Sequence, residues 1–350
     1  MKTFKKQFGG SIRKKDLEKF ASSNQWDGNK FNNLSLTTMG FSFKKLPEVL
    51  KDNFSKNIQR IPKQHLPILP IDIDQYSKSN KEARFSWFGH SVLLFHLNGK
   101  NILIDPMFGE NASPIAPFKT KRFSKNTLQI IDQLPAIDAI LLTHDHYDHI
   151  DLESMQKLIP KVDNWLVALG VSRHLEKWGL EAEKIQEMDW WDTVDFEGIK
   201  ITFTPSRHFS GRGATDRAKS LWGGFVFKTA TESIYHSGDG GYDNHFKEVG
   251  KKYGPFDLMF VECGQYYKHW HQIHLYPEES VQAAIDAKAK SAIPIHWAGF
   301  SLAPHSWKDG VERFTAEAEN LNLNTYTPSM GETFSLNTLQ SNNFWWKDVK

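Results

Sequence analysis

The sequence predicts an α+β fold in which two β-sheets pack face to face and helices cover their outer sides. Two observations lead to this prediction: strand signals dominate both halves of the chain, and helical patterns follow the strands in each half. The 350 residues suffice to bury a large core, for which 12 Trp and 25 Phe supply large side chains. We expect an irregular extension over residues 1–80, packing on or leading into a main domain over residues 81–340.

The first half of the main domain contains a hairpin and a buried strand. Residues 84–106, "RFSWFGHSVLLFHLNGKNILIDP", read as two strands around a turn at Asn98-Gly99. The short apolar run 137–143, "IDAILLT", is typical of a buried strand. Beyond a histidine-rich stretch, apolar residues recur at helical spacing after Asp151, which is a suitable N-cap.

The second half of the main domain shows the same pattern of strand signals followed by helical signals. Its strand signals lie at 199–205, 221–229, 232–239, 257–263 and 291–296. Pro277 marks the start of a helix, with Glu278 and Glu279 in the first turn, and a last helix is predicted across 308–320.

Composition narrows the classes of protein and the compartment. The formal net charge of +2 and the pI near 8.3 do not favour a nucleic-acid partner. Cys263 is the single cysteine, which excludes an intramolecular disulfide and a zinc finger and fits a reducing compartment. With no apolar stretch of about 18 residues and no apolar signal-peptide core, we expect a cytoplasmic protein. The basic, aromatic residues 2–20 are either a solvated leader or a peripheral membrane contact.

The stretch "LLTHDHYDHID" (141–151) carries the strongest chemical signal. It contains H-x-H-x-D-H, formed by His144, His146, Asp148 and His149. Imidazole and carboxylate groups bind zinc and similar divalent ions. Residues i and i+2 of an extended segment point the same way, so His144 and His146 can hold one ion. Asp148 and His149 can then face a second ion.

Three further residues at later strand ends complete two ligand sets. His208 follows one strand signal, Asp239 ends another in "SGDGGY", and His296 ends "SAIPIH". We expect His144, His146 and His208 to hold one ion, and Asp148, His149 and His296 the other, with Asp239 bridging them. The set suits zinc, with manganese and iron as alternatives.

A string of segments, in order, resembles one known family. These are "WFGHSVLL", "IDPMF…ASP", "KRF", "LPAIDAILLTHDHYDHID", "MDWWD", "FTPSRHFSGR", "LWGGFVF", "SGDGGY", "KKYGPFDL", "HLYPEES" and "AIPIHWAGFSLA". They resemble the metallo-β-lactamase superfamily, and within it a bacterial member of the N-acyl-phosphatidylethanolamine phospholipase D type. The resemblance runs from about Trp87 to Ala303 and implies a four-layer αββα sandwich; residues 261–280 depart from the family pattern and are more aromatic.

The resemblance implies a metal-dependent hydrolase that cleaves a phosphodiester bond of N-acyl-phosphatidylethanolamine or a related phospholipid. A metal-bridging hydroxide would attack the phosphorus, with Asp148, Asp239 and His274 as catalytic residues and His274 as proton donor or oxyanion partner. The alternatives are a sugar-lactone lactonase and a metal-bound sensor or binding module without turnover. The family also implies a possible homodimer.

Several other side chains are expected near the predicted site. Tyr266, Tyr267, His269, Trp270 and Phe300 form either an aromatic, substrate-binding mouth or part of the core. His90 is either a group that supports the metal ligands or a residue that seals the hairpin.

Overall fold

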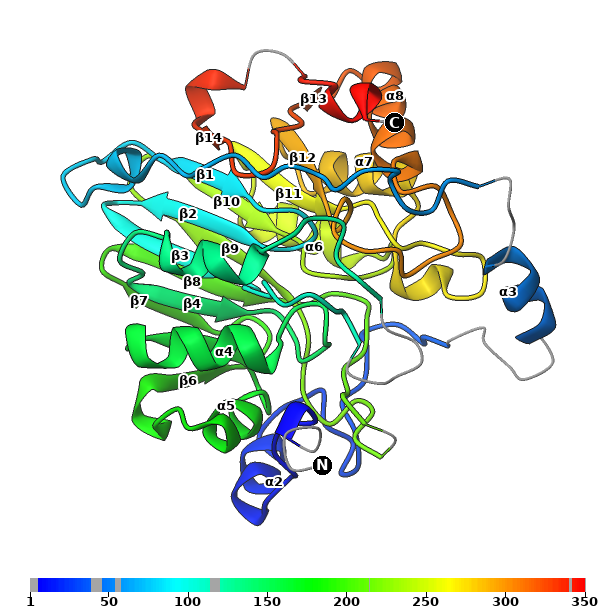
Figure 1. The fold of residues 1–350 in the computed structure, drawn as a ribbon. Helices are drawn as coiled ribbons and strands as arrows, with labels where there is room; N and C mark the ends of the chain where they lie inside the picture. Colours follow the sequence, from blue (N-terminus) through cyan, green and yellow to red (C-terminus); the bar gives the residue numbers. More distant parts are fainter. Residues whose placement is uncertain are drawn as a thin grey trace.

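Two seven-stranded sheets pack face to face in the computed structural model of the protein, with helices on their outer sides (Figure 1). The structure describes residues 6–38, 46–53, 58–113, 120–213, 215–339 and 342–349. Positions 2–5 of the basic leader and Pro114 of the "ASP" segment lie outside the described residues. The predicted two-sheet α+β architecture is confirmed.

The first sheet has the strand order β14-β1-β2-β3-β4-β5-β6. Its strands are β1 (Arg84–Trp87), β2 (Leu93–Leu97), β3 (Lys100–Ile104), β4 (Ala139–Leu142), β5 (Trp165–Ala168), β6 (Ile185–Met188) and β14 (Thr333–Phe334). The predicted turn at Asn98-Gly99 joins β2 to β3, and both of its residues have positive φ, as a tight hairpin requires. The expectation of one strand before that turn is wrong: positive φ at Gly89 and His90 folds the segment into two antiparallel strands.

The second sheet has the order β13-β12-β11-β10-β9-β8-β7. Its strands are β7 (Thr193–Phe196), β8 (Ile199–Thr204), β9 (Gly224–Lys228), β10 (Ser233–His236), β11 (Leu258–Glu262), β12 (Ser291–Ile295) and β13 (Asn324–Thr325). Strands β10 to β13 run parallel, whereas β9 is antiparallel to both β8 and β10. The carboxyl ends of β8, β10, β11 and β12 therefore meet at one edge of the sheet.

Helices cover both outer faces. The α-helices are α2 (Lys14–Phe20), α3 (Leu46–Asn53), α4 (Leu152–Leu158), α5 (Ser172–Trp178), α6 (His245–Lys252), α7 (Pro277–Asp286) and α8 (Asp309–Asn320). Short 3₁₀ helices span Ile73–Tyr76, Thr127–Asp132, Ile159–Lys161, Ala182–Lys184, His271–Ile273, Leu336–Thr338 and Trp345–Asp348. Two predicted helix starts are confirmed: Asp151 accepts a hydrogen bond from the Ser154 amide (2.9 Å), and Pro277 opens α7.

Phenylalanines from both sheets meet in the core. Phe85 and Phe95 of the first sheet contact Phe260 of β11, with ring centroids 5.6 and 4.8 Å apart, and Phe95 lies 5.3 Å from Phe227 of β9. All four side chains have no solvent exposure. Since each ring fills space between the sheets, this cluster holds the two layers at a fixed separation.

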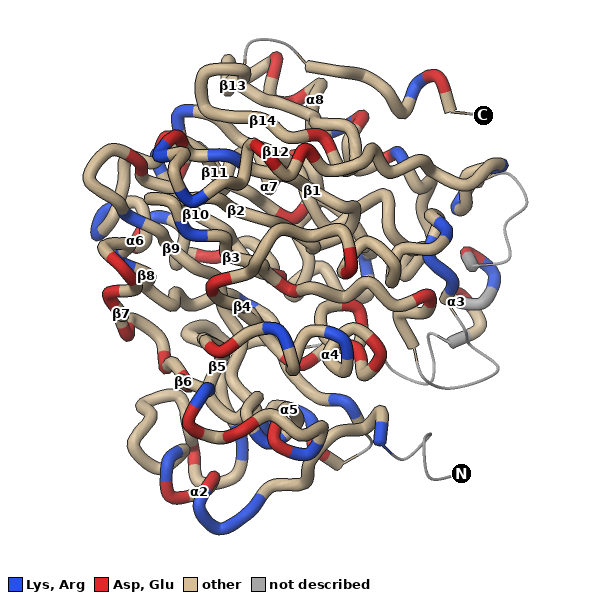
Figure 2. The backbone as a smooth tube through the Cα atoms, turned by 60° about the vertical axis from the view of Figure 1, so that its left-hand side comes forward, with Lys and Arg blue, Asp and Glu red and all other residues tan. Residues whose placement is uncertain are grey.

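The described part of the N-terminal extension packs on the main domain. Arg13 binds Asp16 and reaches Glu176 of α5 (2.9 Å to Oε1). Figure 2 shows acidic and basic positions close together along helices such as α2 and α4, while strands such as β4 and β5 contain no charged residue. Among the described residues, no helix is both long and apolar enough to cross a membrane.

Replacing Phe260 by Ala leaves a cavity between the sheets. We expect Phe260→Ala to lower the free energy of unfolding by about 3–5 kcal/mol, because the neighbouring rings collapse only partly into the space. Urea unfolding at neutral pH measures the loss. Phe344→Ala is the matched control, because Phe344 is 42% exposed, and it should change the free energy little. Equal effects of the two substitutions would contradict this account of the core.

The Arg13–Glu176 ion pair joins the extension to the main domain, and its contribution to stability depends on pH. The hydrogen bond from Arg13 lowers the pKa of Glu176 from 4.5 to about 2. A lowered folded-state pKa stabilises the fold fully above 4.5, and the contribution is lost as the pH falls toward 2. We expect Glu176→Gln to cost at most about 1 kcal/mol at pH 7, because solvent screens the pair, and less at pH 4. Thermal unfolding at both pH values tests this, with the exposed Glu181→Gln as control; a difference that grows as the pH falls would contradict it.

Candidate metal centre

The seven predicted metal ligands meet where the two sheets present strand ends to each other. His144 follows β4 of the first sheet, while His208, Asp239 and His296 follow β8, β10 and β12 of the second. Asp148 and His149 lie between β4 and α4, whose N-cap Asp151 ends the turn. Five of the seven side chains are buried, and His146 and Asp148 are partly exposed.

Three imidazole nitrogens converge in the first expected ligand set. Nδ1 of His146 lies 2.9 Å from Nε2 of His144 and 3.2 Å from Nε2 of His208. Nδ1 of His208 donates to the Ile273 carbonyl (2.9 Å). Nδ1 of His144 donates to Oγ1 of Thr143 (2.9 Å), whose own proton goes to Asp105. These bonds leave the Nε2 atoms of His144 and His208 with lone pairs that both face His146.

A proton on Nδ1 of His146 could satisfy only one of these two lone pairs, whereas a metal ion between the three nitrogens would satisfy all of them, so this set fits a metal ion. Two nitrogens bound at tetrahedral angles to one zinc ion lie about 3.3 Å apart, close to the distances found here. Burial lowers the pKa of His144 and of His208 well below the usual value. Both rings are therefore neutral near pH 7, which is the form that binds metals.

The second expected set combines the carboxylate of Asp148 with two imidazoles. Oδ2 of Asp148 lies 3.4 Å from Nε2 of His296 and 3.7 Å from Nε2 of His149. His90 joins them, with Nε2 2.9 Å from the same oxygen. The described residues of this group, His90 included, place one ligand atom each within 4.8 Å of one another.

Asp239 lies between the two sets. Its Oδ2 is 3.0 Å from Nε2 of both His149 and His296, and 4.0 Å from Nε2 of both His144 and His208. Burial raises the pKa of Asp239, but the adjacent His149 and His296 outweigh it and hold the pKa well below its usual value. Asp239 is therefore a carboxylate that contacts both halves of the cluster.

Asp105 is a site residue that the sequence analysis missed. Its Oδ2 accepts from Nδ1 of His149 (2.8 Å) and Oγ1 of Thr143 (2.6 Å), and its Oδ1 accepts from the Thr143 amide (2.8 Å). It therefore orients one histidine from each ligand set, His149 directly and His144 through Thr143. Its position directly after β3, at the same sheet edge, was the available signal.

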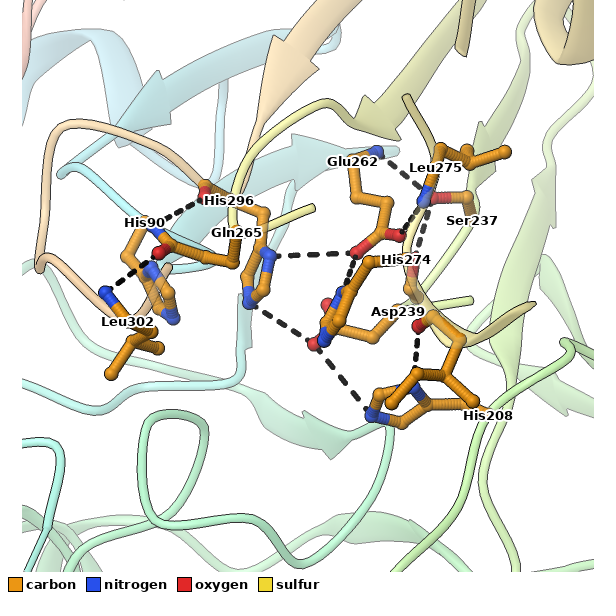
Figure 3. Close-up of polar contacts among 12 residues, drawn as sticks. His90, His208, Ser237, Asp239, Glu262, Gln265, His274, Leu275, His296 and Leu302 are labelled. Carbon is orange, nitrogen blue, oxygen red and sulfur yellow. Dashed lines mark hydrogen bonds and ion pairs between the residues drawn. The ribbon is translucent and has the colours of Figure 1, made fainter. Parts of the chain in front are cut away.

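His274 lies beside the cluster and is held by Glu262, a second residue that the sequence analysis missed. The ring of His274 lies 5.0 Å from that of His208 and stacks on that of His296 at 5.3 Å. Its Nδ1 lies 2.9 Å from Oε2 of Glu262. A dashed line marks this contact in Figure 3. Burial raises the pKa of Glu262, although His274 and His296 act in the opposite direction.

The expected aromatic mouth divides into parts. Phe300 packs edge-on against His90 with ring centroids 5.1 Å apart, so it borders the cluster. Tyr266 contacts α8 instead, through its hydroxyl to Asp309, and stacks on His305. The hydroxyl of Tyr267 binds Asp52 of α3 (2.6 Å).

The indole of Trp270, another of the expected mouth residues, donates to the Gln265 carbonyl (2.8 Å), and the ring lies 4.8 Å from that of Tyr267. His269 is buried, and its Nε2 lies 2.9 Å from Glu48 of α3. The contacts of Tyr266 with Asp309 and His305 favour a packing role over substrate contact. Of the five expected mouth residues, only Phe300 contacts a residue of the cluster among the interactions of the described residues. The backbone of His90 pairs with that of Trp297, and its ring contacts Asp148; its support of the metal ligands stays a prediction.

Comparison with known proteins identifies the family. Residues 100–297 match the family model of the β-lactamase superfamily domain, so the chain belongs to this superfamily. A protein of Mycobacterium tuberculosis is 35% identical to it over 80% of this chain and 77% of its own length. The N-acyl-phosphatidylethanolamine-hydrolyzing phospholipase D 1 of Caenorhabditis elegans is 28% identical over 81% of this chain and 85% of its own length.

A solved structure shares the fold. The metallo hydrolase of the archaeon Ignicoccus hospitalis superposes with a TM-score of 0.57 at 19% identity, covering 72% of this chain and 97% of that chain. The expected metallo-β-lactamase fold is confirmed. The chain is a metal-dependent hydrolase of this superfamily, with a candidate His/Asp metal cluster at the sheet edge.

Asp105 provides a test of how the cluster is oriented. We expect Asp105→Asn to weaken metal binding about ten- to hundredfold, because the one oxygen of an amide cannot replace both carboxylate oxygens, which together accept three hydrogen bonds from His149 and Thr143. Titration against a chelating dye, with metal analysis of the purified protein, measures the change. Asp138→Asn is the control, since Asp138 accepts from the Asn101 backbone away from the cluster. Unchanged affinity in Asp105→Asn would show that His149 needs no such partner.

Proposed function

We propose that the protein is a dinuclear phosphodiesterase of the phospholipase D type that hydrolyses N-acyl-phosphatidylethanolamine or a related phospholipid. The observation that carries this proposal is the position of Asp239, whose Oδ2 contacts both histidine sets. That arrangement suits two ions that share one carboxylate. The relatedness to a phospholipase D with this substrate in its name supports the choice of bond.

The donor types suit zinc in both positions. His144, His146 and His208 would hold one ion, and Asp148, His149 and His296 the other. Two divalent cations would offset the negative charge of the phosphate and lower the pKa of a water molecule. Hydrolysis then consumes one water, breaks one P–O bond and yields a phosphatidate and an N-acylethanolamine.

The chain's own side chains would orient the substrate and move the proton. Asp239 would lie between the ions, where its carboxylate fixes their relative position. His274 would carry the proton between reactants: its free Nε2 takes a proton from the attacking water and passes it to the leaving alkoxide oxygen, while its Nδ1–H stays bound to Glu262. Phe300, against His90, would exclude water on one side.

A cavity lined in part by the residue next to Phe300 supports a lipid substrate. It has a volume of about 820 Å³ and reaches Ser301, the neighbour of Phe300. Lys63 and Lys121 line it together with the exposed Ile61, so both cationic and apolar groups face the space. None of the seven candidate ligands lines it, so it suits the parts of the substrate away from the reacting phosphate. Phospholipids offer both an anionic headgroup and acyl chains to such a surface.

Turnover of three substrates tests the proposal. We expect zinc-loaded protein to release N-acylethanolamine from N-acyl-phosphatidylethanolamine in mixed micelles, and to act weakly on a sugar lactone and a simple bis-phosphodiester. Asp148→Asn should reduce the lipid activity about hundredfold or more, because it removes a carboxylate ligand. Asp163→Asn, at a residue whose side chain is 81% exposed, is the control and should leave activity unchanged.

The outcomes separate the alternatives. Activity on the lactone without activity on the lipid would support the lactonase. Metal binding without any turnover would support a sensor module. Metal analysis after stripping and reloading with zinc, manganese or iron should give two ions per chain, and one ion per chain would contradict the dinuclear proposal.

A further inference from the structure

Glu262 is a buried carboxylate outside the seven-residue ligand set. It ends β11, one strand from His296, and its side chain has no solvent exposure. Its Oε1 accepts from the Leu275 amide (2.8 Å), and its Oε2 faces Nδ1 of His274 (2.9 Å). Oε2 also lies 3.4 Å from Nδ1 of His296. Figure 3 shows the carboxylate between these two rings.

The arrangement fixes both the orientation and the tautomer of His274. The Glu262 carboxylate accepts from the Leu275 amide and lies against two imidazole nitrogens, and in its carboxylate form it only accepts hydrogen bonds, so the nitrogen of His274 that faces it carries the shared proton. Nδ1 of His274 is that nitrogen, which leaves Nε2 on the opposite side of the ring. No hydrogen bond joins Nε2 to another atom in the described part of the chain, and the side chain is 13% exposed. The ring thus presents one free nitrogen beside the rings of His208 and His296.

We propose that Glu262 is a positioning residue that holds His274 with Nδ1 protonated and Nε2 directed at the reacting group. This deepens the proposed function and depends on it only for the role of His274 in turnover. The contact with His274 is the main one, because the 3.4 Å approach leaves Nδ1 of His296 without a hydrogen bond among the described residues. Leu275 and His274 are adjacent, so the same carboxylate also fixes the backbone that carries the ring.

Glu262→Gln reverses the donor pattern with almost no change of shape. The Gln carbonyl can still accept from the Leu275 amide, but its NH₂ group then faces Nδ1 of His274 and donates to it. We expect the ring to shift its proton to Nε2. Nitrogen-15 NMR of the zinc-loaded protein reads this directly: Nδ1 should be the protonated nitrogen of His274 in the wild type, and Nε2 in Glu262→Gln. Wild-type protein with the proton on Nε2 would overturn the proposal, whether or not the variant folds.

Kinetics supply the second readout. We expect Glu262→Gln to reduce kcat about ten- to hundredfold at similar KM, with zinc content and thermal stability close to wild type. Glu262→Asp, which keeps an ionised acceptor, should recover part of the loss. In a His274→Ala background, Glu262→Gln should have little further effect, because it acts through the missing ring. Glu278→Gln, on the exposed side of α7, is the matched control.

Additive losses in the double variant, or a loss of kcat that tracks lost zinc, would overturn the proposal. If the wild type hydrolyses none of the three substrates, the proposed function fails, while the NMR result still decides whether Glu262 sets the His274 tautomer.

Discussion

Imidazole lone pairs directed at one another at a buried sheet edge are the constraint around which the site is organised. Two neutral rings, His144 and His208, face the same nitrogen of His146, and hydrogen bonds on their far sides prevent either from turning its proton inward. Such a cluster is unfavourable without a cation, because Nδ1 of His146 can donate to only one of the two lone pairs and the other is left buried without a donor. The bonds to Thr143 and to the Ile273 carbonyl fix the orientation of the His144 and His208 rings. A cation bound between the rings would satisfy the lone pair that has no donor.

Three residues with strained backbone conformations lie at the candidate metal cluster. His90, Asp105 and His296 all have φ between 43° and 66°, a region that non-glycine residues seldom adopt and that costs of the order of 1 kcal/mol each. Each of the three directs its side chain into the cluster immediately beyond a strand or turn. Two backbone hydrogen bonds also join the sheets here: the His296 amide donates to the His90 carbonyl, and the His90 amide donates to the Trp297 carbonyl. Two of the strained residues, His90 and His296, therefore also form the backbone contact that joins the two sheets at this edge.

The sequence predicted the parts of this protein that have a local signal. The two-sheet architecture followed from strand patterns, and the helix starts at Asp151 and Pro277 followed from capping chemistry that involves residues three or four apart. The meeting of seven candidate ligands could be expected because each follows a strand and parallel strands end at one edge. Which of them hold metal ions stays a prediction.

The rest could not be predicted because it depends on tertiary geometry. Asp105 and Glu262 look like ordinary residues at strand ends until the fold places them against His149 and His274. Tyr266 follows a site strand, yet its ring turns toward α8, and only the packed structure shows this direction.

The loop that carries the first ligands is held from behind by a buried polar network. Asp145, between His144 and His146, has no exposed side-chain area and accepts from Ser220 (2.5 Å), His174 (3.2 Å) and the Gly211 amide (2.7 Å). Burying such a carboxylate gives little net stability, because the desolvation cost offsets the bonds it forms. Its effect is on direction: with Asp145 fixed on the inner side of the loop, the side chains on either side of it in sequence must point to the metal cluster. The other nitrogen of His174 accepts from the Gly10 amide (3.2 Å), so the N-terminal segment closes the network from outside. The segment around Gly10, which carries little of the family resemblance, therefore contributes to the orientation of His144 and His146.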